Sequence, residues 1–318
     1  IVRLLNSNEM KVPTIDFCKS ELKPGTTQWD STKSQVFQAL QEYGCFEAIY
    51  DKLRNETLEA MFGRSREIFE FPWEIKMKNL SKKLPFNGYI GKLPTLPFYE
   101  SVCIDDLLQP ETFANIFWPE GNPEFCNVVK SYSKPLVELD EMVKRMVLES
   151  LGLQNYIDQF LDLTTFQLRL TKYNADQDDE IGNKPGIGDH TDGSFLTIIS
   201  QNKVNGLQIL KKNGEWIDVD ISSNSFVVLS GDSFVAWTNG RLHSPLHRVT
   251  MAGENDRFSI QLFADPKTDC TIKAPKELVD EEHPLLFKPY DMLGYFEFFG
   301  TEARREAGPN VLKAYCGV

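Results

Sequence analysis

The 318-residue sequence has no long uninterrupted run of apolar residues. No run approaches the roughly 18 residues that a membrane-spanning helix requires. Basic residues are also in the minority, because 34 Lys and Arg stand against 46 Asp and Glu, a net charge of −12. A nucleic-acid-binding protein needs a basic face to displace counterions from phosphates. We therefore expect neither a membrane nor a nucleic acid as a partner.

Cysteine is scarce as well, with six residues and no CxxC pair. Such a content is far too low for a disulfide scaffold and predicts mostly buried free thiols in a reducing cytosol. The opening Ile1-Val2-Arg3-Leu4-Leu5 is too short and too interrupted to form a signal peptide. The sequence does not begin with Met, which leaves a trimmed leader open. We expect a cytoplasmic protein.

The first half of the chain is predicted to be mainly helical. Apolar residues recur at helical spacing over Ser31–Glu42 and over 133–151. Pro135 suits the first turn of the second helix, and Gly152 suits its end. Proline and glycine recur over 84–98, which predicts a loop.

The second half changes character near residue 165, where short β-rich runs separated by turn signals follow one another without helices. This spacing predicts a sandwich or jelly roll rather than a parallel α/β sheet. The tail regains helical character over 290–307. Together with one short strand near the start, the predicted strands are Val12–Phe17, Phe166–Tyr173, Phe195–Gln201, Gly206–Lys211, Trp216–Ile221, Phe226–Leu229, Phe234–Thr238, Leu246–Met251 and Phe258–Ala264.

The domain prediction follows from this change. We expect a mainly β fold with flanking helices, organised as a single domain over 1–318. Within it, a mostly helical wrapping region over 1–160 precedes a jelly-roll catalytic core over 161–270, and a helical tail occupies 271–318. The wrapping region would also supply elements of the substrate wall.

Only four histidines are present, which makes their placement informative. His190 and Asp192 are two positions apart, and alternation along a strand turns both side chains to one face. His247 lies in another predicted strand. Two imidazoles and one carboxylate occupy one face of an octahedral metal and leave three positions open, as in non-haem Fe(II) oxygenases. The lack of a thiolate disfavours a structural zinc site.

A second motif, Arg257-Phe258-Ser259, follows ten residues after His247. Alternation points Arg257 and Ser259 the same way, so a guanidinium and a hydroxyl can grip one carboxylate end-on. Tyr173 can add a phenol hydrogen bond to the same ligand. The alternative is a structural salt bridge between Arg257 and one of the 46 acidic residues.

Taken together, these segments resemble the plant Fe(II)- and 2-oxoglutarate-dependent dioxygenases, the group that contains anthocyanidin synthase and the gibberellin oxidases. The resemblance extends from about residue 12 to the end. Leu96–Ser101 and His283–Pro289 resemble the AOP-type branch, which includes glucosinolate side-chain oxygenases and steroidal-alkaloid hydroxylases. The segments that carry the family resemblance are Val12–Asp16, Tyr43–Phe46, Tyr173, His190-Thr191-Asp192, Gly206-Leu207-Gln208, Gly231-Asp232, Thr238-Asn239-Gly240, His247-Arg248-Val249 and Arg257-Phe258-Ser259.

The resemblance implies a double-stranded β-helix, a cupin-like jelly roll, with Fe(II) as cofactor, 2-oxoglutarate as co-substrate, O2 as oxidant and ascorbate as reductant. It implies that iron is held by His190, Asp192 and His247. The distal carboxylate of 2-oxoglutarate would be bound by Arg257 and Ser259, assisted by Tyr173. The other two histidines, His243 and His283, are expected to be non-ligands.

The implied reaction is hydroxylation of an unactivated C–H bond in a mid-sized, largely apolar specialised metabolite, with release of succinate and CO2. Alternatives are desaturation, ring closure or dealkylation, an oxidase of the isopenicillin-N-synthase kind that does not use 2-oxoglutarate, and a non-catalytic bicupin or storage-type β protein. A small molecule is the expected partner of a monomeric enzyme.

Substrate-lining residues are predicted from position alone. Arg169 faces the same way as Tyr173 by even spacing, and others lie along the Arg257 strand or on the N-terminal wall. Relatives commonly carry a proline-rich stretch after the tyrosine, whereas here an acidic stretch follows, which leaves the path of the 174–188 loop open and favours a solvated loop. The full set of candidates is Arg169, Phe263, Asp265, Phe98, Tyr99, Phe113 and Asn115.

Overall fold

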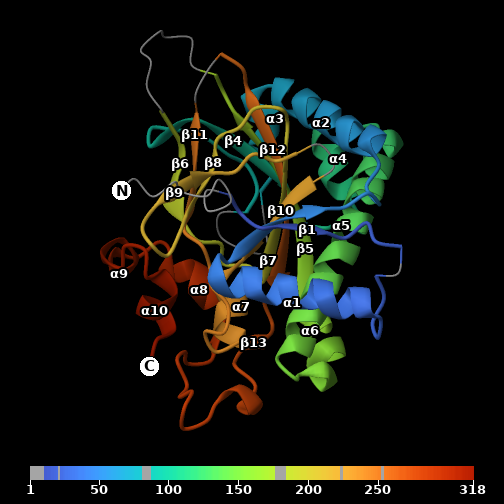
Figure 1. Cartoon of the computed structure of the whole chain (residues 1–318). Helices are drawn as coiled ribbons and strands as arrows, with labels where there is room; N and C mark the ends of the chain where they lie inside the picture. The colour runs from blue at the N-terminus through green and yellow to red at the C-terminus, as the bar shows by residue number, and fades with distance from the viewer. Residues whose placement is uncertain (1–10, 21, 81–86, 176–183, 223–224, 252–253) are drawn as a thin grey trace, which may run out of the picture.

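The computed structural model describes residues 11–20, 22–80, 87–175, 184–222, 225–251 and 254–318 (Figure 1). The acidic stretch after Ala175 therefore lies largely outside the described residues. The largest element is an eight-stranded sheet, mostly antiparallel. Its strands, in spatial order, are β1 (Thr14–Asp16), β2 (Cys45–Ile49), β10 (Ser225–Ser230), β7 (Leu196–Gln201), β12 (Arg257–Pro266), β5 (Thr164–Tyr173), β4 (Leu96–Ile104) and β3 (Ile90–Leu93).

A four-stranded sheet lies against the first and completes the β core. Between the two sheets lies a cluster of buried side chains that includes Tyr173, Ile199 and Val249. A separate two-stranded ribbon lies within the tail. The strands of the four-stranded sheet are β6 (Lys184–His190), β11 (His247–Met251), β8 (Leu207–Leu210) and β9 (Trp216–Asp218), and those of the ribbon are β13 (Thr271–Ile272) and β14 (Tyr290–Asp291).

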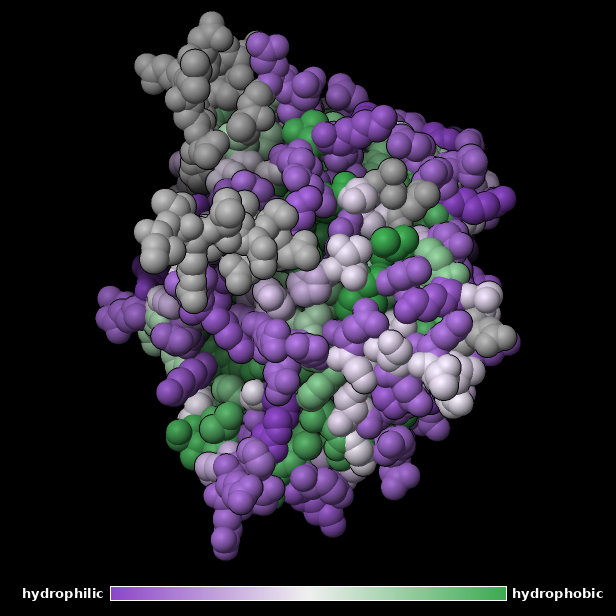
Figure 2. Space-filling model, in the orientation of Figure 1, coloured by the Kyte–Doolittle hydropathy of each residue, from purple (hydrophilic) through white to green (hydrophobic). Residues whose placement is uncertain are grey.

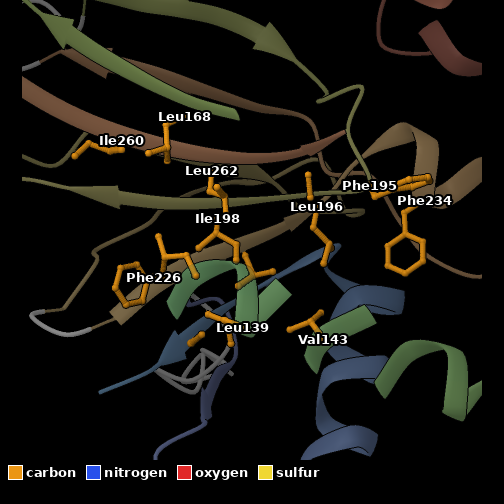
Figure 3. Close-up of a cluster of buried hydrophobic side chains, with 14 of the residues drawn as sticks. Leu139, Val143, Leu168, Phe195, Leu196, Ile198, Phe226, Phe234, Ile260 and Leu262 are labelled. Carbon is orange, nitrogen blue, oxygen red and sulfur yellow. The ribbon is translucent and has the colours of Figure 1, made fainter. Parts of the chain in front are cut away.

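The two faces of the large sheet differ in chemistry because successive residues of a strand point to opposite sides. Leu168 of β5 and Leu262 of β12 are paired in register and lie in the main hydrophobic cluster with Leu139 and Val143 of helix α5 (Pro123–Ser150) (Figure 3). Arg169 and Gln261, also paired in register, point to the other face. The apolar face anchors the sheet, which leaves the opposite face free for chemistry.

Helices cover the apolar face. α5 is amphipathic, with buried residues at helical spacing that include Leu136, Val143 and Val147, and it contacts α1 (Thr27–Glu42) and α2 (Asn55–Glu70). The shorter helices on the N-terminal side are α3 (Trp73–Lys76), α4 (Glu111–Phe117) and α6 (Ile157–Asp162), with a 3₁₀ turn at Gln154–Tyr156. Those near the C-terminus are α7 (Asp232–Trp237), α8 (Met292–Phe298), α9 (Glu302–Glu306) and α10 (Val311–Cys316), with a 3₁₀ turn at Lys276–Leu278.

Two predicted helix starts are wrong, because the capping residues lie further upstream. The side chain of Thr26 accepts a hydrogen bond from the backbone N–H of Trp29, so α1 begins four residues before Ser31. Asn122 caps α5 in the same way at 2.9 Å, which places Pro135 inside the helix rather than in its first turn. The predicted helix end is correct, since Gly152 follows α5 with a positive φ of 72°.

The predicted strand at Phe234–Thr238 is also wrong, since this segment forms the short helix α7. The apolar run reflects burial and not a pleated backbone, because Phe234 and Trp237 are both buried against the Phe160 ring of α6. The single tail helix expected over 290–307 is divided among α8 and α9, with α10 beyond it.

The loop predicted over 84–98 is replaced in its described part by the β3–β4 hairpin, whose pair Leu93 and Leu96 flanks a turn with Pro94. Pro97 precedes Tyr99, the first residue of β4 that pairs with β5, so its missing N–H costs that pairing no hydrogen bond. Strand β6, which lies beyond the acidic stretch, was absent from the predicted set.

Hydrophilic side chains cover most of the visible face, with smaller hydrophobic areas between them (Figure 2). Among the described residues, none of the helices combines the length and apolarity that crossing a bilayer requires. All six cysteines are free thiols, and Cys45, Cys103, Cys126 and Cys316 are buried, as predicted.

Candidate metal centre

Two neighbouring strands bring the predicted metal ligands together. His190 ends β6 and His247 begins β11, and the two residues are direct partners in the antiparallel register. Their ring centroids are 4.2 Å apart. Asp192 follows in the turn after β6, with Oδ1 3.9 Å from Nε2 of His190 and 3.7 Å from Nε2 of His247. Three donor atoms therefore converge on one point.

The orientation of each ligand side chain is fixed by a hydrogen bond at its other polar atom, the one that does not face the metal site. Nδ1 of His190 lies 2.8 Å from the carbonyl oxygen of Gly188, and Nδ1 of His247 lies 3.1 Å from that of Pro245. Each ring can thus donate through Nδ1 and present an unprotonated Nε2 to a metal. Oδ2 of Asp192 accepts a hydrogen bond from Thr197 Oγ1 at 2.6 Å, which leaves Oδ1 to face the imidazoles.

The electrostatics of the cluster favour neutral imidazole. Burial and the neighbouring His247 lower the pKa of His190 to about 4. A neutral ring is the form that binds a metal, so protons compete weakly for this donor at neutral pH.

Among the described residues, these three form the group of His, Cys, Asp and Glu side chains that can hold a metal ion. Two nitrogen donors and one carboxylate oxygen, with no thiolate, suit Fe(II) with open coordination positions. The remaining histidines lie elsewhere: His243 is half-buried and its backbone N–H donates to the carbonyl of Leu40, and His283 is exposed beside Asp280.

Arg257 is a buried cation on the cavity face of β12. Its side chain is 1% exposed, yet no carboxylate forms an ion pair with it in the described part of the chain. One terminal nitrogen donates to Gln201 Oε1 at 2.8 Å, another donates to Ser259 Oγ at 3.3 Å, and Nε has no hydrogen-bond partner. Burial lowers the pKa of Arg257, but a guanidinium stays charged at neutral pH.

The buried Arg257 guanidinium, which has no carboxylate partner in the described residues, is suited to bind an anionic ligand. Burying an uncompensated cation costs several kcal/mol, which an incoming carboxylate would offset. The alternative of a structural salt bridge to an acidic residue therefore has no partner among the described residues. Both the donor set of the metal cluster and the unsatisfied guanidinium fit Fe(II) and 2-oxoglutarate.

The residues beside Arg257 form a closely packed pocket around its guanidinium, which we call the Arg257 pocket. The Tyr173 ring, 3% exposed, lies with its centroid 5.0 Å from the guanidinium carbon. Gly186 of β6 packs against this ring so closely that an added Cβ would lie 2.7 Å from a ring carbon. Ser259 is held in turn by Gln261, whose amide donates to the hydroxyl at 2.7 Å.

One cavity of about 500 Å³ connects the metal cluster with the Arg257 pocket. Four of the predicted substrate residues line it: Arg169, Phe263, Asp265 and Tyr99.

The other three predicted substrate residues are not among the described residues that line this cavity. Phe113 is buried in an aromatic cluster with Phe117 and Phe125, where α4 packs on α5, so it belongs to the hydrophobic core. Asn115 is exposed on the same helix. Phe98 uses its backbone carbonyl to accept a hydrogen bond from the N–H of Asn174.

Several cavity residues escaped prediction. Gln167, Thr171 and Gln261 share the inward face of β5 and β12, and extending the two-residue alternation from Tyr173 and Arg257 would have found them. Phe296, Phe299 and Arg304 come from the C-terminal segment, for which no local signal exists.

The cavity has a polar end away from the Arg257 pocket. Asp265, 3% exposed, accepts a hydrogen bond from Gln167 Nε2 at 2.5 Å, and Gln167 Oε1 accepts from Asn87 Nδ2 at 2.8 Å. Burial raises the pKa of Asp265 to about 7. Arg169 donates to Ser101 Oγ at 2.9 Å in the same region. The polar groups at this end can therefore recognise hydrogen-bonding groups of a ligand.

Comparison with known proteins places the chain in a family. The 2OG-Fe(II) oxygenase superfamily matches residues 153–266, and the family described as non-haem dioxygenase in morphine synthesis N-terminal matches residues 12–96. A protein of Arabidopsis thaliana named "Probable 2-oxoglutarate-dependent dioxygenase AOP1.2" is 44% identical over 308 residues, which cover 95% of this chain and 94% of that protein.

Solved structures agree with this assignment. The rice dioxygenase for auxin oxidation is 30% identical, with a TM-score of 0.77 over 97% of this chain and all of that one. The dioxygenase for auxin oxidation 1 of Arabidopsis thaliana, in a binary complex with 2-oxoglutarate, is 27% identical, with a TM-score of 0.76 over 86% of this chain and 99% of that one. These likenesses confirm the predicted jelly-roll fold with flanking helices. The chain therefore belongs to the 2OG-Fe(II) oxygenase superfamily, in its AOP-type branch, and is a 2-oxoglutarate-dependent dioxygenase that uses Fe(II).

Proposed function

We propose that this enzyme hydroxylates an unactivated C–H bond of a mid-sized, largely apolar specialised metabolite, with release of succinate and CO2. In this proposal His190, Asp192 and His247 hold iron through Nε2, Oδ1 and Nε2. Arg257 and Ser259 bind the distal carboxylate of 2-oxoglutarate, and Tyr173 shapes the same pocket. The observation that carries the proposal is the buried guanidinium without a carboxylate partner, which shares one cavity with the three converging donors.

The chemistry of the side chains indicates which tasks fall to iron and which to the protein. Iron supplies the O2 activation that oxidation of an inert C–H bond requires, which no amino-acid side chain provides. The protein holds and orients the reactants. Arg257 and Ser259 hold the co-substrate at one end, so that its other end is directed towards the metal cluster along the cavity.

The cavity walls support the proposed substrate class. Ile90, Phe263, Phe296 and Phe299 provide apolar surface, which excludes water from the reacting C–H bond. Asp265 stands at the polar end and supports recognition of a hydroxyl or amine on the substrate. A volume of about 500 Å³ suits a mid-sized molecule bound together with 2-oxoglutarate.

A spectroscopic titration tests the co-substrate assignment. Under anaerobic conditions, we expect the Fe(II)-loaded protein to develop a metal-to-ligand charge-transfer band when 2-oxoglutarate is added. An oxidase of the isopenicillin-N-synthase kind would develop no such band. A band that saturates equally in the wild type and in Arg257→Met would overturn the assignment of Arg257.

A second experiment addresses the reaction. Plant metabolite extracts are incubated with the enzyme, Fe(II), ascorbate and 2-oxoglutarate, and succinate is measured together with mass changes in the extract. Hydroxylation predicts a metabolite that gains one oxygen atom. Loss of two hydrogen atoms would replace hydroxylation by desaturation or ring closure, and loss of an alkyl group would replace it by dealkylation.

The proposal also covers the domain organisation, the cellular location and the oligomeric state of the enzyme. The main hydrophobic cluster contains residues from Ile15 to Cys316, which supports a single domain over 1–318, with a wrapping region over 1–160, a catalytic core over 161–270 and a tail over 271–318. Free thiols support a cytoplasmic location, and we favour a monomer. One cooperative calorimetric transition and a monomeric sedimentation coefficient are the expected results.

A further inference from the structure

The turn that carries the Asp192 ligand is clamped between α7 and the C-terminal segment. We call Thr191–Ser194 the metal turn. Asp232, the first residue of α7, accepts a hydrogen bond from Thr191 Oγ1 at 2.9 Å, and its backbone N–H donates to the carbonyl of Asp192 at 2.7 Å. The hydroxyl of Tyr295 on α8 donates to the same Asp232 oxygen, Oδ2, at 2.5 Å. A continuous chain of hydrogen bonds thus joins α8 to the metal turn.

A parallel set of contacts lies on the other side of the turn. Ser233 Oγ donates to the carbonyl of Gly193 at 2.5 Å and lies 3.2 Å from the hydroxyl of Tyr290. The C-terminal segment also packs directly on Gly193, where an added Cβ would lie 3.2 Å from a Met292 carbon and 3.6 Å from a Phe296 carbon. No space separates α8 from the metal turn.

The Asp232 carboxylate makes these contacts energetically important. Asp232 is 3% exposed and Tyr295 is fully buried, and no Lys or Arg forms an ion pair with Asp232 in the part of the chain that the structure describes. The carboxylate therefore depends on hydroxyl donors, those of Thr191 and Tyr295. A short hydrogen bond to a carboxylate is stronger than one between neutral groups, and its loss leaves a buried oxygen unsatisfied.

We propose that Tyr295 is a positioning residue for the metal centre: through Asp232 it holds the metal turn in the conformation that presents Oδ1 of Asp192 to the ion. This inference rests on the proposed iron site. Partners of this kind set the orientation of metal ligands, and their loss typically weakens metal binding 10- to 100-fold.

The same helix also reaches the substrate cavity. Phe296 follows Tyr295 directly and lines the cavity wall, as does Phe299. The C-terminal segment, which is remote in sequence from the catalytic core on which it docks, therefore both contacts the metal turn and lines the substrate cavity (Figure 1).

The test compares two tyrosines of one aromatic cluster. The rings of Tyr295 and Tyr315 lie 5.2 Å apart, and in the described residues the Tyr315 hydroxyl has no hydrogen bond. Metal-free full-length protein is titrated with Co(II), which is followed by its visible absorption. We expect Tyr295→Phe to weaken Co(II) binding about tenfold and to change the Co(II) spectrum, and we expect Tyr315→Phe to stay within about twofold of the wild type.

A second pair of variants keeps the inference falsifiable if Tyr295→Phe fails to fold. Thr191→Val removes the hydroxyl that donates a hydrogen bond to Asp232, whereas Thr191→Ser retains that hydroxyl. We expect weaker Co(II) binding for the valine variant and rescue by the serine variant.

The outcomes separate the inference from the proposed function. Equal Co(II) affinities and spectra in all variants and the wild type would overturn the role of Tyr295 and leave the iron site intact. Equal melting-temperature losses in both tyrosine variants, with unchanged affinity, would reduce Tyr295 to a packing residue. A wild type that binds no Co(II) would overturn the iron site itself, and this inference with it.

Discussion

Two buried cations, Lys144 and Arg257, lie on opposite faces of the large sheet and differ in whether a carboxylate lies beside them. Lys144 of α5 is fully buried on the helical side, 2.8 Å from the carboxylate of Asp140 and 3.0 Å from Thr164 Oγ1. The Phe166 and Phe195 rings lie within 5.4 Å of its ammonium. Arg257 is buried on the cavity side without a carboxylate in the described residues. One charge is compensated inside the protein and the other is not.

The difference distinguishes a structural charge from a functional one. A cation that is neutralised internally has no free energy left to bind an external anion, so Lys144 contributes to the connection between α5 and β5. A cation held without compensation keeps that free energy for a ligand. Burial alone would rank the two residues equally. The partner that each possesses decides which of them belongs to a binding site.

The largest expected effect comes from removing the partner of the structural cation. Asp140→Ala leaves the Lys144 ammonium buried without a counter-charge, and we expect the free energy of unfolding in urea to fall by about 3–5 kcal/mol. Asp140→Leu combined with Lys144→Met removes both charges and should return close to wild-type stability. A loss below about 1 kcal/mol in the single variant would contradict the structural role of the pair.

Replacing Arg257 is expected to weaken 2-oxoglutarate binding without lowering the free energy of unfolding. Arg257→Met loses hydrogen bonds to a charged ligand, so 2-oxoglutarate affinity should fall by about 1.5–3 kcal/mol, roughly 10- to 150-fold. The ligand-free protein should unfold in urea at wild-type stability or above, because an uncompensated buried charge is gone. Anaerobic titration and urea unfolding measure the two quantities. A stability loss as large as that of Asp140→Ala would make Arg257 a structural residue.

A third prediction concerns pH and the buried carboxyl at the polar end. The pKa of Asp265 is raised from 3.8 to about 7, so between these values the native state binds more protons than the unfolded state. The contribution of Asp265 to stability should therefore fall as pH rises from about 4 to 7, by on the order of 1–2 kcal/mol. Urea unfolding of the wild type and of Asp265→Asn at pH 5 and pH 8 measures this contribution, because the histidines affect both proteins alike and only the wild type should lose the Asp265 contribution as pH rises. An identical slope in that variant would assign the pH dependence to other groups.

The smallest effect tests the neighbour of the functional cation. Ser259→Ala removes one neutral hydroxyl from the Arg257 pocket, and we expect 2-oxoglutarate affinity to fall by about 0.5–1.5 kcal/mol, roughly 2- to 10-fold. Asn115→Ala, on the exposed face of α4, is the matched control and should bind 2-oxoglutarate like the wild type. Equal binding by both variants would remove Ser259 from the co-substrate site.

Local rules predicted one of the two key pairs for the right reason. Arg257 and Ser259 are two positions apart on β12, so strand alternation turns both side chains to one face. His190 and Asp192 are also two positions apart, but β6 ends at His190, so the turn that follows brings the Asp192 carboxylate beside the imidazole. The predicted β runs of the second half are strands except for Phe234–Thr238, where burial imitates β propensity. Helix starts failed where a cap such as Thr26 lies before the first apolar residue of the pattern.

The sequence by itself determined the donor types, their spacing along each strand and the mainly β character of the core, because these depend on neighbours within a few residues. Only the tertiary structure decided that His247 pairs with His190, that Arg257 has no carboxylate partner in the described residues, and that Phe296 rather than Phe113 reaches the cavity. Such facts depend on contacts between segments far apart in the chain. Local spacing carries no information about them, because packing of the whole core selects which distant segments meet.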